Sequence, residues 1–387
     1  MNRRNFLSLT GTFTGGSLLL PSFLNTFAMQ KNLVVGEQCL VFIQLNGGND
    51  GLNTFIPFQD ELYYKLRPNI AISKTDVVGA SAGMAFHPAL KDFATMQQAG
   101  ELSVIQNVGY DNPVRSHFRS QEIWQTAPTN QEYLNNGWLG RYLDEQNSYA
   151  TAAVNIDSID NLALKGQEPN AITVKDPSRF LTKNTNDSDM KLSDNPQLDF
   201  VRKIANAIYE GSDDIQNALK SAAVSDVSYP KTALAKNLEW ISKLIKGNLN
   251  SKVYYTTLGS FDTHDNQLAV HKNKLTDLND AVFSFYQDLK KANLLQNVTI
   301  VVFSEFGRRV KDNGKGTDHG TAAPMFIIGG NNKGKTIGKN PNLSDLDNGD
   351  LKYEIDFRSV YASLLQNKMN FDSSKIGIKN KVLNGLF

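Results

Sequence analysis

Short apolar runs alternate along the chain with longer amphipathic segments. Residues 39–45 are apolar on both faces, which is the pattern of a strand buried within a parallel sheet. Similar runs predict strands at residues 102–108, 152–156, 171–174, 252–258, 298–303 and 325–328. Helical periodicity is found at residues 115–126, 137–144, 267–292 and 357–365. Strands that alternate with helices predict an α/β fold with a central, mostly parallel sheet sandwiched by helices.

Two stretches depart from this alternation. Residues 176–195 are rich in Asn, Asp, Ser, Thr and Lys, and we expect an exposed insertion there. Residues 198–245 are helical in pattern with a break near residues 227–230, and they could form either a cap or a helical layer. We expect both to belong to one α/β domain that spans residues 29–387.

The first 28 residues have the pattern of an export signal. Arg3 and Arg4 are followed by Phe6-Leu7, the signature of the twin-arginine route, and an ordinary secretion signal is the alternative. The apolar run that follows is broken by three glycines and a proline, so it is too short to span a bilayer. A small-x-small cleavage site precedes Met29. We therefore expect a periplasmic or otherwise extracytoplasmic protein, and because this route carries folded proteins, a loaded metal is a reasonable expectation.

Composition narrows the chemistry further. Removal of the two leader arginines takes the net charge from +1 to −1, which gives no electrostatic argument for nucleic acid or an anionic membrane. No later apolar run reaches about 18 residues, so we expect no membrane span after the signal. Cys39 is the only cysteine, which excludes a disulfide framework and a multi-cysteine metal site. Its apolar neighbours predict a buried, inert thiol, and any metal must be held by nitrogen and oxygen ligands.

Polar clusters lie beside the predicted strands, where sites form in open α/β sheets. A glycine-rich turn at residues 47–54 presents Asp50, although an Asx-turn would also explain that aspartate. Asp262 and His264 are two residues apart, so both can point to one side of an extended loop. We expect these side chains to share a cation.

Two further clusters flank the last strands. Glu305 directly follows a buried strand, and a carboxylate there is costly unless it is paired or bound to a cation. Arg308 is either its partner or a ligand for an anion. Asp318 and His319 are adjacent between glycines and precede a strand, and such residues bind zinc, manganese or iron.

The clusters together supply four carboxylates and two histidines. That is enough for one or two divalent cations about 3.5–4 Å apart, an arrangement that hydrolyses phosphate esters. No Gly-x-Ser-x-Gly elbow is present, and no Gly-x-Gly-x-x-Gly follows the first strand, which disfavours a serine hydrolase and nicotinamide chemistry. The candidate metal ligands are Asp50, Asp262, His264, Glu305, Asp318 and His319.

A nucleophile could come from the start of the helix predicted at residues 115–126. Ser116 would face the positive end of the helix dipole, which favours an alkoxide and binds phosphate. Arg115 would hold the anion with Arg308, and His117 would assist. The alternative is that Ser116 only caps the helix; Thr54 is a weaker candidate nucleophile.

The order of these segments resembles the bacterial family known as domain of unknown function 1501. The shared segments are the twin-arginine leader and residues 46–50, 115–118, 262–264, 304–308 and 318–320. That family is placed in the alkaline phosphatase and sulfatase superfamily. The resemblance implies an alkaline-phosphatase-like sheet between helices, with a dinuclear metal site.

The resemblance also implies roles for single residues. Asp50 looks like the superfamily's first-strand ligand, and His319 looks like its late histidine ligand. Asp262 and His264 look like its Asp-and-His pair, although the superfamily usually spaces that pair four apart. Asp318 would be a ligand or would support one.

Other positions depart from the superfamily. Glu305 stands where an Asp-His pair usually follows a strand, and Phe306 replaces that histidine. Ser116 occupies roughly the place of the nucleophile. No Cys-x-Pro-x-Arg or Ser-x-Pro-x-Arg is present to mature into formylglycine, so sulfatase activity of that type is not expected.

We therefore predict an exported metal-dependent hydrolase of phosphate or sulfate esters. Its substrate would be a small anionic ester, and its cofactors one or two divalent metal ions such as zinc or manganese. The alternative is a non-catalytic metal-binding envelope protein with a degenerate phosphatase-like site. Members of the family are often encoded beside a second exported family, which implies an exported partner protein for the insertion and the segment at residues 198–245.

Overall fold

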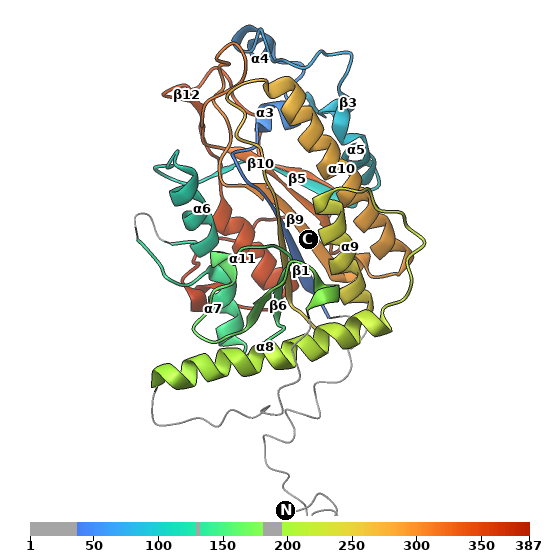
Figure 1. Ribbon diagram of the computed structural model, residues 1–387. Coiled ribbons are helices and arrows are strands. Elements are labelled where there is room, and N and C mark those ends of the chain that lie inside the picture. Colours follow the sequence, from blue (N-terminus) through green and yellow to red (C-terminus); the bar gives the residue numbers. More distant parts are fainter. Residues whose placement is uncertain (1–36, 129–131, 181–195) are drawn as a thin grey trace, which may run out of the picture. The chain divides into compact units, whose positions relative to one another are not determined.

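The strand predicted at residues 39–45 lies at the centre of the sheet. The computed structural model describes residues 37–128, 132–180 and 196–387 (Figure 1). β1 (Cys39–Leu45) pairs in parallel with β8 (Val253–Leu258) on one side and with β9 (Val298–Ser304) on the other. Every residue of β1 is buried, and burial raises the pKa of the Cys39 thiol to about 12. The thiol is therefore inert, as predicted.

Some sequence predictions fall on other parts of the chain. The predicted export signal at residues 1–28 lies outside the described residues, as do residues 181–195 of the predicted insertion. Within the described residues, no helix is both long enough and apolar enough to cross a membrane.

The central sheet has nine strands in the order β11-β5-β10-β9-β1-β8-β6-β7, with β14 paired to β5. β10 is antiparallel to both of its neighbours, and the other pairings are parallel. The predicted mostly parallel sheet is therefore confirmed. The further strands are β5 (Leu102–Gly109), β6 (Ala153–Asn155), β7 (Ala171–Thr173), β10 (Ala323–Gly329), β11 (Thr336–Ile337) and β14 (Ile355–Asp356).

Helices cover both faces of this sheet (Figure 1). Successive side chains of a strand point to opposite faces, so Val41 and Ile43 enter one core while Leu40 and Phe42 enter the other. The first core is completed by α5 (Lys91–Gln98), α9 (Ala233–Lys246) and α10 (Gln267–Lys291). The second is completed by α6 (His117–Thr126), α7 (Trp138–Glu145) and α11 (Phe357–Lys368).

The segment predicted as a cap or a helical layer forms two helices. α8 (Pro196–Ser221) and α9 are separated by residues 222–232, close to the predicted break. The apolar face of α9 is part of the first core, with Leu238, Ile241 and Leu244 fully buried. α9 is therefore a layer on the sheet.

Smaller elements lie beyond the end of β1 and the start of β10. They enclose a third apolar cluster that includes Leu52, Tyr63 and Val310. These short elements had no clear periodicity in the sequence. They are α3 (Gly51–Thr54), β2 (Phe55–Ile56), α4 (Glu61–Leu66), β3 (Val78–Ser81), β4 (Met84–Phe86), β12 (Leu346–Asp347) and β13 (Asp350–Leu351).

Candidate metal centre

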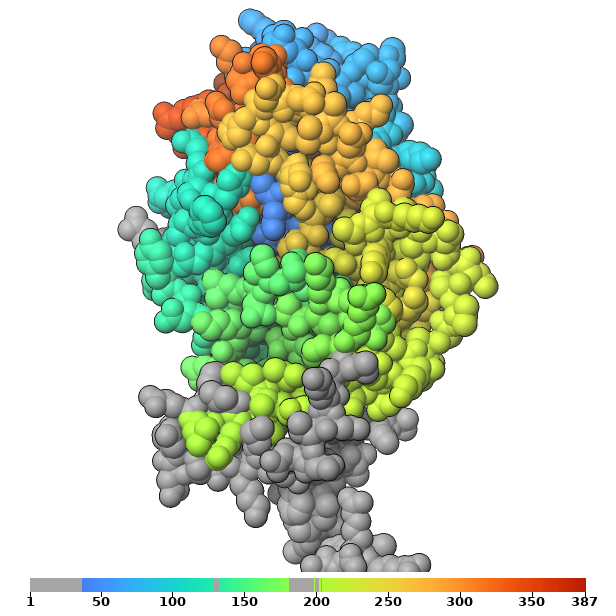
Figure 2. All heavy atoms as spheres, in the orientation of Figure 1, coloured from blue at the N-terminus to red at the C-terminus, as the bar shows by residue number. Residues whose placement is uncertain are grey.

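The strands β1, β5, β8 and β9 run parallel, so they all end at one edge of the sheet, where α/β proteins place their sites. The loops after β1, β8 and β9 meet there, together with the start of α6 and the segment before β10. An isolated β-bridge between Arg308 and His319 joins the loop after β9 to the segment before β10. In Figure 2, blue atoms from an early part of the chain are visible between the teal atoms of α6 and the yellow-orange atoms around α10.

Three histidines surround the carboxylate of Asp262. His264 Nε2 lies 2.9 Å from Asp262 Oδ1, and His319 Nε2 lies 3.3 Å from the same oxygen. His117 Nε2 lies 3.5 Å from Asp262 Oδ2. The Nε2 atoms of His264 and His319 are 3.0 Å apart. One ligand atom each from His117, Asp262 and His319 fit within 4.8 Å of one another.

The outer nitrogen of each imidazole has an oxygen partner. His117 Nδ1 lies 2.9 Å from Glu305 Oε1, and His264 Nδ1 lies 3.1 Å from Asp318 Oδ1. His319 Nδ1 lies 2.7 Å from the carbonyl oxygen of Arg115. Carbonyl and carboxylate oxygens accept hydrogen bonds, so we assign the hydrogen to each Nδ1 and a lone pair to each Nε2. This is the usual arrangement of histidines that bind metals.

The residues fit a cation. Ligands about 2.0–2.1 Å from a tetrahedral zinc ion are separated from one another by about 3.3 Å, and the four distances above range from 2.9 to 3.5 Å. His117 Nε2 is buried with no hydrogen-bond partner among the described residues. Lone pairs that face one another repel unless positive charge lies between them. A proton can serve one pair of these atoms, whereas one metal ion can take a ligand atom from each of His117, Asp262 and His319.

Arg308 holds Asp262 from behind. Its side chain is buried, and it donates to the carbonyl oxygens of Gly47, Gly48, Phe261 and Thr317 as well as to Asp262 Oδ1 at 2.6 Å. Partial burial opposes ionisation of Asp262, but the hydrogen bond and charge of Arg308 outweigh it and lower its pKa to about 2. Asp262 is therefore a carboxylate at neutral pH. The Arg308 guanidinium donates to acceptors within the protein. This differs from the predicted role, in which it would bind an anion.

Glu305 supports His117 from a fully buried position. Its Oε1 accepts from the backbone N–H of Gly47 at 2.8 Å and from Gln121 at 3.3 Å, besides His117. The hydrogen bond to Glu305 is the main cause that raises the pKa of His117, against the opposing effect of its burial. The Glu305 carboxylate, whose burial was predicted to be costly without a partner, thus has its hydrogen bonds satisfied by N–H donors. Glu305 stands behind a candidate ligand.

Phe306 packs against two of the histidines, and the glycine turn at residues 47–48 packs against Phe306. The Phe306 ring centroid lies 4.8 Å from that of His117 and 5.0 Å from that of His319. Gly48 has a φ of +72°, and a Cβ there would lie 2.3 Å from the Phe306 ring. The turn after β1 therefore requires glycine for both its backbone conformation and this close approach.

Asp50 does not join the cluster around Asp262. Its Oδ2 accepts from Arg67 at 2.6 Å and from Gln267 at 2.5 Å, and both charged side chains are fully buried. Burial opposes ionisation of Asp50, but the adjacent Arg67 outweighs it and lowers its pKa. A guanidinium thus occupies the position where the sequence predicted a cation.

Arg115 and Ser116 lie at the solvent side of the cluster. The Arg115 side chain is 41% exposed and pairs with Asp350, the only side chain among the described residues that accepts from it. Ser116 is exposed in extended backbone just before α6, and its side chain makes no capping hydrogen bond. The predicted helix therefore begins at His117, and the capping alternative for Ser116 is not what the structure shows.

The predicted residues separate into three groups. Asp262, His264 and His319 converge, and His117, predicted only as an assisting residue, joins them. Glu305 and Asp318 stand behind two of the histidines. Asp50 and Arg308 are engaged in buried contacts, and Arg67 was missed because nothing in its local sequence distinguishes a buried arginine from an exposed one.

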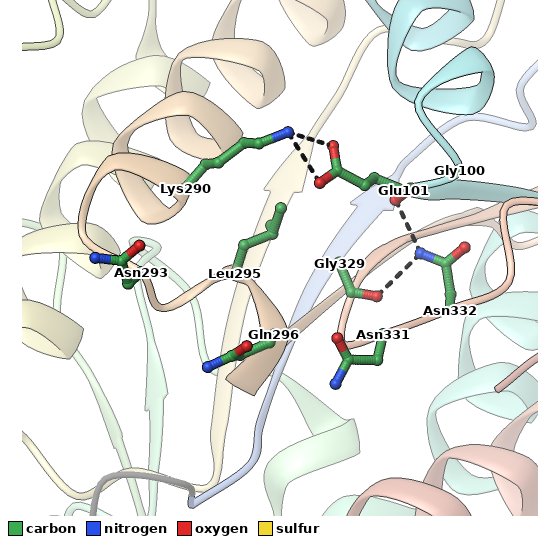
Figure 3. Close-up of a pocket in the computed structure, with 9 residues that line it drawn as sticks. All are labelled: Gly100, Glu101, Lys290, Asn293, Leu295, Gln296, Gly329, Asn331 and Asn332. Atoms are coloured by element: carbon green, nitrogen blue, oxygen red, sulfur yellow. Dashed lines mark hydrogen bonds and ion pairs between the residues drawn. The ribbon is translucent and has the colours of Figure 1, made fainter.

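A separate pocket of about 360 Å³ lies at the other end of the sheet, where β5 and β9 begin and β10 ends (Figure 3). Its wall carries the Glu101–Lys290 ion pair, and Asn332 is held by the carbonyl oxygens of Glu101 and Gly329. It shares no residue with the histidine cluster.

Comparison with known protein families assigns the chain to one of them. Residues 37–370 match the family described as protein of unknown function (DUF1501), so the chain belongs to that family. The predicted family is confirmed. Comparison with curated protein sequences finds no match.

Several solved structures are similar to the chain at low identity. A sulfatase from Pseudoalteromonas sp. has a TM-score of 0.40 and 11% identity, with 94% of this chain and 75% of that chain covered. A protein in the alkaline phosphatase superfamily from Vibrio parahaemolyticus has a TM-score of 0.38 and 13% identity over 79% and 64%. The phosphonate monoester hydrolase of Agrobacterium radiobacter has a TM-score of 0.37 and 8% identity over 86% and 74%. Similarity at this level assigns neither an activity nor a site residue.

Proposed function

We propose that this member of the DUF1501 family is an exported, metal-dependent hydrolase of phosphate or sulfate esters. The observation that carries the proposal is the convergence of three imidazole Nε2 atoms on the Asp262 carboxylate, with each Nδ1 fixed by an oxygen behind it. His117, His264, His319 and Asp262 would hold the cation. A divalent cation bound there supplies Lewis-acid polarisation of an ester oxygen.

The chain's own residues supply the remaining chemistry. Ser116 is the candidate nucleophile, since its exposed hydroxyl lies at the positive end of α6 and makes no capping bond. Attack of Ser116 Oγ on phosphorus or sulfur would break the ester bond, and the serine proton would leave with the released alcohol. Water would then hydrolyse the seryl ester, which restores Ser116 and frees phosphate or sulfate.

Arg115 is the candidate anion-binding residue. Its guanidinium is fixed by the buried Asp350 carboxylate while 41% of the side chain remains exposed. Paired N–H groups of arginine suit the oxygens of phosphate and sulfate. Arg308, by contrast, is fully occupied by the protein's own acceptors, and its role in the proposal is to orient Asp262.

A second candidate function is metal binding without turnover, in an envelope protein. It is favoured by the number of ligands, because four side chains saturate a tetrahedral cation as in structural zinc sites. An exported partner protein remains part of this second candidate.

Two substitutions distinguish the candidates in protein reloaded with zinc or manganese. An enzyme should lose hydrolysis of aryl phosphates or sulfates in both Ser116→Ala and Asp262→Asn, and only the second should lose metal. A binding protein should show no turnover in any form, and again only Asp262→Asn should lose metal. Turnover that survives in Ser116→Ala would exclude the serine nucleophile.

A further inference from the structure

We infer that Gln267 is a positioning residue which holds the two ligand-bearing loops of the metal centre in register. The inference rests on the metal site proposed above. Gln267 is the first residue of α10 and is fully buried, and among the described residues its side chain makes no hydrogen bond to His117, His264, His319 or Asp262.

The side-chain amide of Gln267 joins three segments. Its Oε1 accepts from the hydroxyl of Thr317 at 2.6 Å and from that of Thr263 at 3.2 Å. Its Nε2 donates to Asp50 Oδ2. One amide thus connects the loop after β8, the loop before β10 and the buried Asp50–Arg67 pair.

The two threonines are neighbours of the ligands. Thr263 lies between Asp262 and His264, and Thr317 directly precedes Asp318 and His319. A shift of the Thr263 hydroxyl would therefore move Asp262 and His264, and a shift of the Thr317 hydroxyl would move Asp318 and His319. Ligand atoms about 3 Å apart tolerate little such movement, because metal coordination distances are fixed within about 0.2 Å.

The backbones of the two loops are in direct contact at this point. The N–H of Thr317 donates to the carbonyl oxygen of Thr263 at 3.2 Å. A Cβ at Gly316 would lie 2.3 Å from that same oxygen, so only glycine allows the approach. Both threonines are buried, so their hydroxyls are shielded from bulk solvent. The sequence gives no hint of this link, since Gln267 was predicted only as part of a helix.

Burial also makes the link strong. A hydrogen bond in a buried site is not weakened by exchange with solvent, and leaving an acceptor such as Gln267 Oε1 unpaired carries a desolvation cost. Asp50 and Arg67 extend the link to Asn53 and to the carbonyl oxygens of Arg309 and Val310. The amide of Gln267 therefore links the ligand loops to the smaller elements beyond the sheet.

The test measures Co²⁺ affinity and the Co²⁺ absorption spectrum of the full chain. Thr317→Val removes the donor to Gln267 while keeping the shape, and Thr317→Ser keeps the hydroxyl. We expect Thr317→Val to lose roughly 10- to 100-fold in Co²⁺ affinity and to change the spectrum, as substitutions behind metal ligands do. Thr317→Ser should stay close to the wild type in both measurements.

A matched control is Thr299→Val. Thr299 is fully buried in β9, and its hydroxyl has no partner among the described residues. This control should leave Co²⁺ affinity and spectrum unchanged, which separates positioning from the general effect of losing a buried hydroxyl. Thr263→Val provides a second arm from the other loop and should act like Thr317→Val.

The outcomes distinguish this inference from the proposed function. A wild-type chain that binds no Co²⁺ would overturn the metal proposal, and the inference with it. A wild-type chain that binds Co²⁺, with Thr317→Val and Thr263→Val equal to it in affinity and spectrum, would overturn the inference alone. Loss of folding stability in these variants with unchanged Co²⁺ binding would likewise assign Gln267 a purely structural role.

Discussion

Replacement of Glu305 by glutamine removes a charge behind His117 with little change in shape. The wild-type carboxylate accepts from His117 Nδ1 at 2.9 Å and from the N–H of Gly47 at 2.8 Å through the same oxygen. An amide oxygen can accept both bonds, and the amide NH₂ can face the hydroxyl of Ser304, which lies 3.1 Å from the other carboxylate oxygen. Glu305→Gln therefore tests the charge and preserves the hydrogen bonds.

The magnitude follows from the place of Glu305 behind a candidate ligand. Substitutions of such outer partners typically cost about 10- to 100-fold in metal affinity, which is about 1.4–2.7 kcal/mol. The carboxylate makes the imidazole of His117 a more basic ligand, and a neutral amide does so less. We expect a loss within this range at pH 8, where protons compete least with the metal.

The difference in metal affinity between Glu305→Gln and the wild type should also change with pH in a definite direction. The hydrogen bond to Glu305 is the main cause that raises the pKa of His117, so the variant should have a lower His117 pKa than the wild type. As pH falls, the wild-type imidazole takes up its proton first and loses metal first. The difference in affinity between variant and wild type should therefore narrow at acid pH.

Competition titration of Zn²⁺ against a chromophoric chelator measures both effects. Glu61→Gln is the matched control, since the Glu61 side chain is 80% exposed and pairs with the exposed Lys74. The control should bind Zn²⁺ as the wild type does. A Glu305→Gln affinity within twofold of the wild type at pH 8, or a gap that widens as pH falls, would refute the reasoning about the His117–Glu305 pair.

Three further predictions concern stability and are measured by urea unfolding. Arg67→Met leaves Asp50 as an unpaired, fully buried charge and should lower the free energy of unfolding by about 3–5 kcal/mol; a loss below about 1 kcal/mol would contradict the pairing. Burial lowers the pKa of His271 to about 4, below its ordinary 6.5, so the unfolded chain takes up this proton first. Neutral His271 should therefore contribute of order 3 kcal/mol to the free energy of unfolding above pH 6.5, and this contribution should be lost as pH falls toward 4. His271→Gln should reduce the dependence of the free energy of unfolding on pH in this range. Ser116→Ala should change the free energy of unfolding by less than about 0.5 kcal/mol, because its side chain caps nothing; a larger loss would point to a structural role.

The sequence was sufficient for the main elements of the sheet and its helices. β1 begins and ends at the predicted residues, and β9 extends one residue past its prediction. These strands are buried on both faces, so apolar character alone identifies them. The strands of two residues, such as β11 and β14, have no period to detect, and only their neighbours in the sheet define them.

The ligand types were predictable, but their partners were not. The pattern of Asp262, His264 and His319 beside strand ends placed them in one site. The direction of each side chain depends on contacts between distant segments, which a local pattern does not contain. Arg67 therefore neutralises Asp50 without any sign in the sequence, and His117, the first residue of α6, faces Asp262 from a distant part of the chain.

X-ray absorption on the zinc-loaded full chain, combined with elemental analysis, tests the central claim most directly. We expect one zinc ion per chain whose ligands are imidazole nitrogens and carboxylate oxygen about 2.0–2.1 Å away, and we expect that ion to be lost in His319→Ala. A chain that retains no zinc after loading, or zinc whose spectrum contains no imidazole ligand, would contradict the claim that these histidines and Asp262 form a metal centre.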